Sequence, residues 1–468
     1  MKNYTSLKQI QKELYDNETT CKKLVSGYLK NISKQTRINA FIEVYESESL
    51  LAAEEIDKKI QNQTAGKLAG LVIGIKDNIC YKGHPSTAAS GILKNFKSVY
   101  SATVVRRLIA EDAIILGRLN CDEFAMGSTT ENSIYGPTRN PINLSYVAGG
   151  SSGGSAAAVK ANLCQVSLGS DTGGSIRQPA AFCGVFGLKP TYGAVSRHGL
   201  IAFASSFDQI GPIAKSTDDL SVVMSVIAGK DDYDSTCIGE KLISSESKQK
   251  YKIAIVKDAL DFPGIHPGVK LEFEKLVNRL KKKKHIINEI QLPLLEHLVP
   301  TYYILTTAEA SSNLSRYDGV KYGKQVESDN LNELIRQTRS LGFGDEVKRR
   351  VLLGTYVLSA GYYDAYYTKA QKIRRLIHTK MCSLFEKYDY ILLPTTPNLP
   401  FPIGQHKVDP TKLYYEDVFT VPANLSGHPA ISYPLGEVEN GFFASAQLIG
   451  DYFSESKLLN FTEKIHIN

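Results

Sequence analysis

The sequence predicts an α/β fold, with a large mixed, mostly parallel β-sheet covered by helices on both faces. From Gly70 onward, short apolar segments alternate with helical segments, which is typical of buried parallel strands joined by helices. The chain has 468 residues, of which 43% are hydrophobic and 22% are charged. These values are ordinary for a folded protein with a large core.

Residues 1–65 are expected to form an N-terminal helical flank. Apolar residues recur there every three or four positions, as a helix with one buried face requires. The three groups of apolar residues, one for each expected helix, are Leu7, Ile10 and Leu14; Leu24, Tyr28 and Ile32; and Ala52, Ile56 and Ile60. Residues 66–468 are expected to form a single domain, because no repeat, low-complexity tract or linker divides them.

Strands are predicted where several apolar residues follow one another, at residues 71–75, 113–116, 163–168, 252–256 and 390–393. Helices are predicted at residues 103–111, 269–284, 307–316 and 347–376. The basic run at 281–284 suits a helix C-terminus better than a nucleic-acid surface. Because strands and helices alternate again after residue 250, the C-terminal half is expected to complete the same sheet.

Composition and spacing argue against several other classes of protein. The seven cysteines include no C-x-x-C pair, and the nine histidines include no H-x-x-x-H pair, so we expect reduced thiols and no metal site. No apolar run approaches the roughly 18 residues of a membrane span, and the first residues lack the apolar region of a signal peptide. We therefore expect a cytoplasmic protein without membrane contacts, and its net charge of +7 is mild.

The region from Gly149 to Gly199 holds 11 glycines, and two segments within it, 149–155 and 169–177, place serine among glycines. Glycines between a strand and a helix let successive N–H groups turn toward one point, which forms a cradle for an oxyanion or a phosphate. Neither segment has the spacing of a phosphate-binding loop. An isolated Ser/Gly segment is usually only a loop, but two in one core region favour acyl chemistry, with Ser175 as the nucleophile.

The nucleophile needs a base, for which the sequence offers histidine or lysine. Only His198 among the histidines lies in the glycine-rich block, so a Ser-His-Asp hydrolase is disfavoured. Lys76 directly follows the predicted strand 71–75, at an edge where open α/β sheets bind ligands. Such a lysine is more often a surface residue, but partial burial would lower its pKa enough for it to act as a neutral base.

Residues 74–78, 149–155 and 169–179 together resemble the amidase-signature family, whose catalytic set is Ser-Ser-Lys. The spacings are similar too, with 75 residues from Lys76 to Ser151 and 24 from Ser151 to Ser175. The resemblance runs from about residue 66 and implies an amidase-signature fold for 66–468, with a cis peptide at the bridging serine. It also implies the roles of nucleophile for Ser175, bridging serine for Ser151, base for Lys76, support for that lysine from Ser152, and oxyanion N–H groups from Thr172, Gly173 and Gly174.

Longer stretches narrow the resemblance to one branch of that family, the glutaminase subunits of tRNA-dependent amidotransferases. These stretches are residues 122–127, 176–181, 189–193, 203–212, 309–314 and 353–356. This branch implies that the chain hydrolyses glutamine and supplies ammonia for the amidation of Glu-tRNA(Gln), and often of Asp-tRNA(Asn). It implies a kinase-like B subunit that uses ATP and Mg²⁺ and makes most contacts with the aminoacyl-tRNA, a small C subunit, and no cofactor in this chain.

Glutamine carries an α-carboxylate and an α-ammonium, so its pocket needs a cation and an anion. The resemblance implies that Arg350 and Asp417 supply these charges and that Tyr302 completes the pocket. Arg349 is the alternative to Arg350. Near the C-terminus, Ser445-Ala446-Gln447 replaces the family's usual Gly-Leu-Gln, a change expected to affect strand packing rather than chemistry.

Two other functions stay open at this point. A stand-alone amidase of small amides would share Ser175, Ser151 and Lys76, so these residues cannot separate it from the glutaminase branch. A catalytically inactive scaffold or binding module is disfavoured because the Lys-Ser-Ser set is intact.

Overall fold

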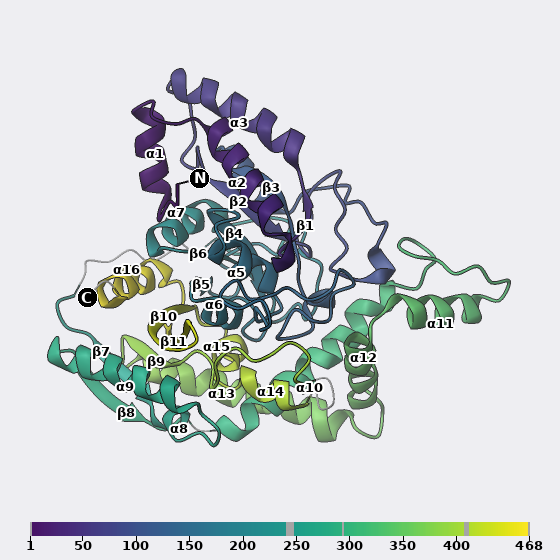
Figure 1. Cartoon of the computed structure of the whole chain (residues 1–468). Coiled ribbons are helices and arrows are strands. Elements are labelled where there is room, and N and C mark those ends of the chain that lie inside the picture. The colour runs from purple at the N-terminus through teal and green to yellow at the C-terminus, as the bar shows by residue number, and fades with distance from the viewer. Residues whose placement is uncertain (1, 240–247, 293, 407–410, 467–468) are drawn as a thin grey trace.

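The computed structural model describes residues 2–239, 248–292, 294–406 and 411–466. Within these ranges one sheet of 11 strands has the order β1-β3-β2-β4-β6-β5-β10-β11-β9-β7-β8. It extends from β1, beside the N-terminal helices, to β8 at the opposite end of the molecule (Figure 1). The strands are β1 Phe41–Val44, β2 Val72–Lys76, β3 Ile114–Leu119, β4 Val166–Asp171, β5 Phe186–Lys189, β6 Gln209–Ala214, β7 Lys252–Val256, β8 Ile286–Ile290, β9 Tyr390–Pro394, β10 Ala430–Glu439 and β11 Phe442–Ile449.

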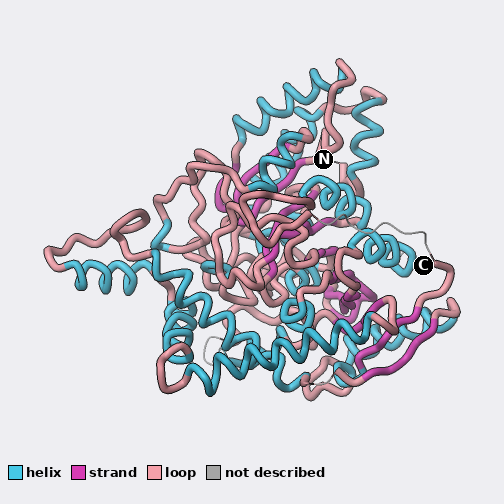
Figure 2. Tube along the Cα trace, turned by 180° about the vertical axis from the view of Figure 1, so that it is seen from behind, coloured by secondary structure: helices cyan, strands magenta, loops and turns pink. Residues whose placement is uncertain are grey.

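Helices cover both faces of this sheet, as predicted (Figures 1 and 2). In β7, Ile253 and Ile255 pack into one apolar cluster, whereas Ala254 and Val256 pack into another on the opposite face. The α-helices are α1 Leu7–Tyr15, α2 Cys21–Lys34, α3 Glu46–Gln61, α4 Thr103–Ala110, α5 Gly153–Lys160, α6 Arg177–Cys183, α7 Thr217–Ile227, α8 Lys257–Leu260, α9 Pro267–Lys282, α10 Leu295–Asn313, α11 Leu331–Gly342, α12 Asp345–Val357, α13 Lys369–Phe385, α14 Thr411–Tyr414, α15 Val421–Ser426 and α16 Glu455–His466.

The sheet is mixed, but the expectation that it is mostly parallel is wrong. The pairs β2–β3, β2–β4, β7–β8 and β7–β9 are parallel, whereas the other six pairings among the described strands are antiparallel. Alternating apolar and helical segments do not reveal the direction in which a strand enters the sheet, and β10 returns as β11 through a tight turn at Asn440 and Gly441. The C-terminal strands do complete the same sheet, as predicted.

The N-terminal segment contains the three expected helices and one strand that the sequence pattern missed. Strand β1 pairs antiparallel with β3 and forms one edge of the sheet. A Cβ on Gly117 of β3 would lie 2.2 Å from the carbonyl oxygen of Glu43, so glycine is what lets the two strands approach. Four half-buried residues carry too short a pattern to distinguish a strand from a loop.

The glycine-rich loops lie where β2 and β4 end. These two strands are parallel neighbours, so Lys76 at the end of β2 and Asp171 at the end of β4 reach the same edge of the sheet. Helix α5 begins within the first Ser/Gly segment, at Gly153, and α6 begins at Arg177, the last residue of the second. The seven cysteines are free, and six of them are buried. No helix in the described ranges is long and apolar enough to cross a bilayer.

Candidate active site

Lys76 is buried among three serine side chains. Its Nζ atom lies 2.7 Å from Ser151 Oγ, 3.0 Å from Ser152 Oγ and 2.9 Å from Ser170 Oγ. The sequence pointed to Ser151 and Ser152 but not to Ser170, which lies on β4. The strand pattern could have indicated Ser170, because this serine lies near the end of a strand that runs parallel to the strand carrying Lys76.

Burial lowers the pKa of Lys76 from its usual 10.5 to about 8, although carboxylates farther away, such as Asp122 and Asp171, oppose the shift. None of the ion pairs found among the described residues includes Lys76. A neutral amine has two N–H bonds and one lone pair. Lys76 can therefore donate to Ser152 and Ser170 while its lone pair accepts the proton of Ser151, which is the geometry of a general base.

The loop that carries Ser151 is held in an unusual backbone geometry. The peptide bond between Gly150 and Ser151 is cis, as the resemblance implies. A Cβ on Gly150 would lie 2.2 Å from Asp122 Oδ2, so only glycine fits there. The N–H of Gly150 donates to Gln178 Oε1 at 2.9 Å, and the N–H of Ser152 donates to the carbonyl oxygen of Ser175 at 3.1 Å. These bonds tie the two Ser/Gly loops together.

Ser175 stands at the open side of this cluster, between β4 and α6. It is 9% exposed, the most of the serines near Lys76. Its hydroxyl makes no hydrogen bond with the protein groups that the structure describes, so it is free to meet a substrate. Ser151, whose hydroxyl contacts the amine of Lys76, is fully buried.

A buried ion pair between Asp171 and Arg177 supports the loop that carries Ser175. No sequence pattern indicated this ion pair. Arg177 Nε and Nη2 each lie 3.1 Å from a carboxylate oxygen of Asp171, and both side chains are fully buried. Asn424 donates to Asp171 Oδ1 at 2.8 Å, and Arg177 donates to Gln447 Oε1 at 2.9 Å. Burial raises the pKa of Asp171, but Arg177 and the other donors outweigh it and hold the pKa at about 2.

The backbone amides of the Ser175 loop differ from expectation at one position. The N–H of Gly174 donates to Asp171 Oδ1 at 2.8 Å. This amide is therefore bonded to the protein itself and is not free to bind an oxyanion. The N–H groups of Thr172, Gly173 and Ser175 make no hydrogen bond to the described loops, turns or side chains. Oxyanion roles for Thr172 and Gly173 stay predictions, and Ser175 N–H joins them.

A buried arginine lies on α12. Arg350 Nε donates to Glu346 Oε1 at 2.8 Å, and its guanidinium lies 5.1 Å from the ring centroid of Tyr303 and 5.5 Å from that of Phe203. Arg349 instead has a half-exposed side chain that pairs with Glu346. Of the two arginines, Arg350 is therefore the one held among aromatic rings inside the protein.

Asp417 supplies a carboxylate near Arg350. It accepts hydrogen bonds from Tyr303 Oη at 3.0 Å and from Ser128 Oγ at 3.3 Å, and burial raises its pKa to about 7. The sequence pointed to Tyr302, but in the structure Tyr303 contacts Asp417. Tyr302 packs over the nucleophile loop, where a Cβ on Gly173 would lie 2.4 Å from its ring. Two adjacent tyrosines on a helix point about 100° apart, and sequence alone could not assign them.

The charged pair and the nucleophile loop are physically connected. Thr420 Oγ1 donates to the carbonyl oxygen of Gly173 at 2.6 Å and also lies 3.0 Å from that of Asp417. A cavity of about 330 Å³ opens beside this group, and it is lined among others by Ser128, Arg349 and Arg350. The lining of this cavity includes Arg350 but neither Asp417 nor Ser175.

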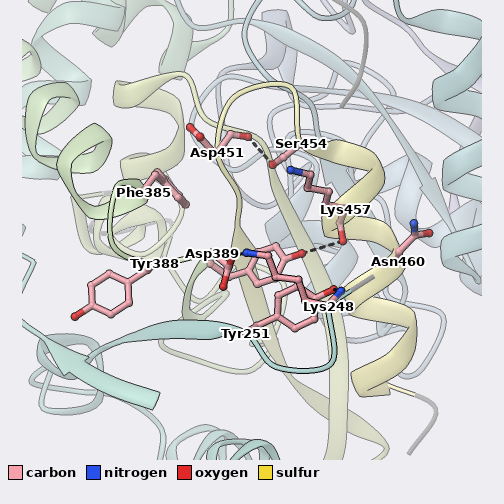
Figure 3. Close-up of a pocket in the computed structure, with 10 residues that line it drawn as sticks. Lys248, Tyr251, Phe385, Tyr388, Asp389, Asp451, Ser454, Lys457 and Asn460 are labelled. Atoms are coloured by element: carbon pink, nitrogen blue, oxygen red, sulfur yellow. Dashed lines mark hydrogen bonds and ion pairs between the residues drawn. The ribbon is translucent and has the colours of Figure 1, made fainter. Parts of the chain in front are cut away.

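Another pocket, drawn in Figure 3, has no such chemistry. It measures about 150 Å³ and is lined by residues of the β7–β9 end of the sheet and of α16. Lys248 pairs with Asp389 at 2.6 Å, and the Ser454 hydroxyl donates to the carbonyl oxygen of Asp451 at 2.6 Å. The hydroxyl of its serine is thus engaged with the backbone.

The arrangement around Lys76 is suited to acyl transfer. The buried amine contacts the hydroxyl of Ser151, and the more exposed Ser175 lies on the loop whose carbonyl accepts the N–H of Ser152. Such a set can deprotonate a serine as it attacks a carbonyl carbon and can stabilise the oxyanion that forms. Among the described residues, no group of three or more His, Cys, Asp or Glu side chains could hold a metal ion.

Comparisons with known proteins agree with this chemistry. The profile of the family described as Amidase matches residues 23–459. The A subunit of the glutamyl-tRNA(Gln) amidotransferase of Chlorobium phaeobacteroides strain BS1 is 46% identical over 99% of this chain and 98% of its own length. The protein of the same name from Chlorobaculum tepidum is 48% identical over 96% of this chain and 95% of its own length.

Solved structures show the same likeness. The crystal structure of the corresponding A subunit from Thermotoga maritima is 41% identical in sequence, with a TM-score of 0.77 over 94% of this chain and 90% of that one. The peptide amidase from Stenotrophomonas maltophilia is 27% identical, with a TM-score of 0.80 over 98% of this chain and 96% of that one.

The pH dependence of amide hydrolysis should follow Lys76. With an uncharged amide as substrate, kcat/KM should rise about ten-fold per pH unit in acid and level off above pH 8, where the amine becomes neutral. Lys76→Arg should lose about 10²–10⁴-fold, because a guanidinium stays protonated. Lys94→Arg, at an exposed lysine, is the control. A flat profile from pH 6 to 9, or a loss of only a few-fold, would contradict this role of Lys76.

Proposed function

The chain belongs to the Amidase family, and we propose that it is the glutamine-hydrolysing A subunit of a glutamyl-tRNA(Gln) amidotransferase. The relatives of that name match it over nearly its whole length. The observation that carries the assignment to glutamine is the buried pair of opposite charges, Arg350 and Asp417, beside the nucleophile loop.

In the proposed reaction, Ser175 Oγ attacks the side-chain carbonyl carbon of glutamine. Its proton passes to Ser151, and the Ser151 proton passes to neutral Lys76. The oxyanion is stabilised by the free N–H groups of Thr172, Gly173 and Ser175. When the C–N bond breaks, the proton returns through Ser151 to the leaving nitrogen, so ammonia departs and a γ-glutamyl ester stays on Ser175. Water then releases glutamate by the same relay in reverse.

Arg350 and Asp417 select the substrate in this proposal. The guanidinium pairs with the α-carboxylate of glutamine, and the Asp417 carboxylate pairs with the α-ammonium. Ser128 and Tyr303 donate to Asp417 and so hold its oxygens in place. A cation bound next to Asp417 lowers its pKa below 7, which keeps it ionised in the complex.

The ammonia is proposed to serve a second active site on a partner. A kinase-like B subunit would use ATP and Mg²⁺ to activate the carboxylate of Glu-tRNA(Gln) and would bind the tRNA, and a small C subunit would join the two. The steps assigned to this chain use its own side chains and need no cofactor. A cytoplasmic location is part of the proposal, because aminoacyl-tRNAs are made there.

A stand-alone amidase is the second candidate, since the peptide amidase shares the fold at lower identity. A neutral amide offers no carboxylate to Arg350 and no ammonium to Asp417, so these two buried side chains would keep only their partners within the protein. The charged pair therefore favours an amino-acid amide. An inactive scaffold is disfavoured by the preserved contacts around Lys76.

Ser175→Ala should separate ammonia production from ammonia use. In the assembled enzyme, glutamine-dependent amidation of Glu-tRNA(Gln) should disappear, because no acyl-enzyme can form. Amidation from ammonium chloride should persist, because the partner's site is untouched. Ser205→Ala, at an exposed serine, should retain both activities. Near wild-type turnover of glutamine by Ser175→Ala, measured as glutamate release, would exclude Ser175 as the nucleophile.

Arg350 and Arg349 form a matched pair for testing substrate recognition. Arg350→Gln should raise the glutamine KM by about 30-fold or more, because losing one partner of a buried charge pair costs about 2–5 kcal/mol. Arg349→Gln should change KM by less than about three-fold, since its ion pair is half-exposed. The glutamine KM should also rise as Asp417 protonates below pH 7. Equal effects of the two arginine variants would argue against this pocket.

A further inference from the structure

Asn78 is a buried polar side chain that the mechanism above does not use. It follows Lys76 and Asp77 directly after β2 and is 1% exposed. Its Nδ2 atom donates to Ser170 Oγ at 2.9 Å, and the same oxygen atom lies 2.9 Å from Lys76 Nζ. Asn78 is therefore connected to the amine of Lys76 through a single hydroxyl group.

The other end of this side-chain amide has no partner. Asn78 Oδ1 is buried and accepts no hydrogen bond from the groups that the structure describes. A buried acceptor without a donor costs stability, and a leucine of similar shape would avoid that cost. Stability alone thus does not explain an asparagine here, and its contact with Ser170 points to the chemistry of Lys76.

Asp77 and Asn78 are adjacent in sequence, but their side chains meet different partners. The Asp77 carboxylate accepts the N–H of Thr87 at 3.1 Å and pairs with Arg118, a side chain that stays protonated. The charged member of this pair of residues therefore lies beside a permanent cation. The neutral member, Asn78, lies on the side of Lys76.

The carboxylates around Lys76 are held by other donors. Burial is the main influence on the pKa of Lys76, and it lowers this pKa. Four ionisable groups act in the opposite direction: Cys121, Asp122, Asp171 and Asp208. Burial raises the pKa of the Cys121 thiol, Asp122 and Asp208 accept N–H groups of their own loops, and Asp171 pairs with Arg177. Among the described residues, Ser170 Oγ links Lys76 to an amide and to no carboxylate.

The partner of Ser170 affects how strongly this serine binds the ammonium form of Lys76. Hydrogen bonds in a chain polarise one another, so a hydroxyl that donates to a carboxylate becomes a stronger acceptor. A hydroxyl that instead accepts an amide N–H has one of its two lone pairs occupied and is a weaker acceptor. With Asn78 beside it, Ser170 orients Lys76 but adds little to the stability of the ammonium form.

We propose that Asn78 is a positioning residue that acts through Ser170 and keeps the amine of Lys76 neutral. The amide holds the Ser170 hydroxyl in place without adding a charge. Lys76 can then donate to Ser152 and Ser170. Its lone pair is left for the proton of Ser151. This inference rests on the proposed function, because it takes from it that Lys76 is the base of amide hydrolysis.

The variant Asn78→Asp keeps the shape of the side chain and adds one negative charge. Because residue 78 and Lys76 contact the same hydroxyl oxygen, this charge would lie within about 6 Å of the amine, where an opposite charge shifts a pKa by about 1–3. With an uncharged amide as substrate, the rise of kcat/KM should move to higher pH by at least about one pH unit, a loss of about ten-fold at pH 7. Above the new rise, kcat/KM should return to within about three-fold of wild type.

Asn95→Asp is the matched control, because it adds the same charge at an exposed asparagine. Its pH profile should coincide with that of wild type. A second readout needs no turnover: in Asn78→Asp protein labelled with ¹³C at lysine Cε, the Lys76 resonance should titrate at a correspondingly higher pH than in wild type.

A neutral variant tests whether Asn78 acts through the serine. Asn78→Ala removes the amide N–H and should also move the rise of kcat/KM to higher pH, by less than the carboxylate does. In a Ser170→Ala background the same replacement should have no further effect, because the hydroxyl through which it acts is gone. If Asn78→Asp does not fold, this comparison decides alone.

Three results would overturn the inference. If the wild-type profile rises with pH but neither Asn78 variant moves it, or activity falls equally at every pH, Asn78 is structural and the proposed function stands. If Asn78→Ala has the same effect with and without Ser170, it admits water to Lys76 rather than acting through the serine. If the wild-type profile is flat, Lys76 is not the base, and the proposed mechanism fails together with this inference.

Discussion

The burial of one lysine amine among serine hydroxyls is the constraint on which the rest of this site depends. In water the amine of Lys76 would stay protonated and could not act as a base. Burial excludes water from this amine, and its hydrogen-bond partners are instead the hydroxyls of Ser151, Ser152 and Ser170. That exchange requires β2 and β4 to be parallel neighbours whose ends meet. It also requires the glycine-rich loop that brings Ser151 and Ser152 to the amine from outside the sheet.

Different surroundings favour a neutral amine at Lys76 and a charged carboxylate at Asp171 in the same site. Lys76 has no carboxylate within ion-pair distance among the described residues, so burial moves its pKa down. Asp171 is equally buried, but Arg177 and Asn424 surround it, so it stays ionised. The ionised carboxylate then accepts the N–H of Gly174, which shapes the loop that carries Ser175. In the proposed substrate pocket, Arg350 is likewise held by Glu346 and aromatic rings rather than by water.

Sequence predicted what local patterns and family motifs encode, and it missed what only folding brings together. Apolar periodicity located five of the 11 strands and about half of the α-helices, and the motifs located Lys76 and its serines. Strand direction was wrong because it depends on how each connection returns to the sheet. Ser170, the Asp171–Arg177 pair and the bond between Tyr303 and Asp417 went unnoticed because each joins residues through side-chain geometry, several of them far apart in the chain. Gly174 was misassigned because its motif shows that amides are clustered, not which group each one faces.

The most direct test of the central claim is a titration of Lys76 itself. In protein labelled with ¹³C at lysine Cε, one resonance that is absent from Lys76→Met should titrate near pH 8, whereas resonances of exposed lysines should titrate near their usual 10.5. The chain without substrate should show this shift, because burial and not ligand causes it. If the Lys76 resonance titrates with those of the exposed lysines, the amine is protonated at working pH and cannot be the base.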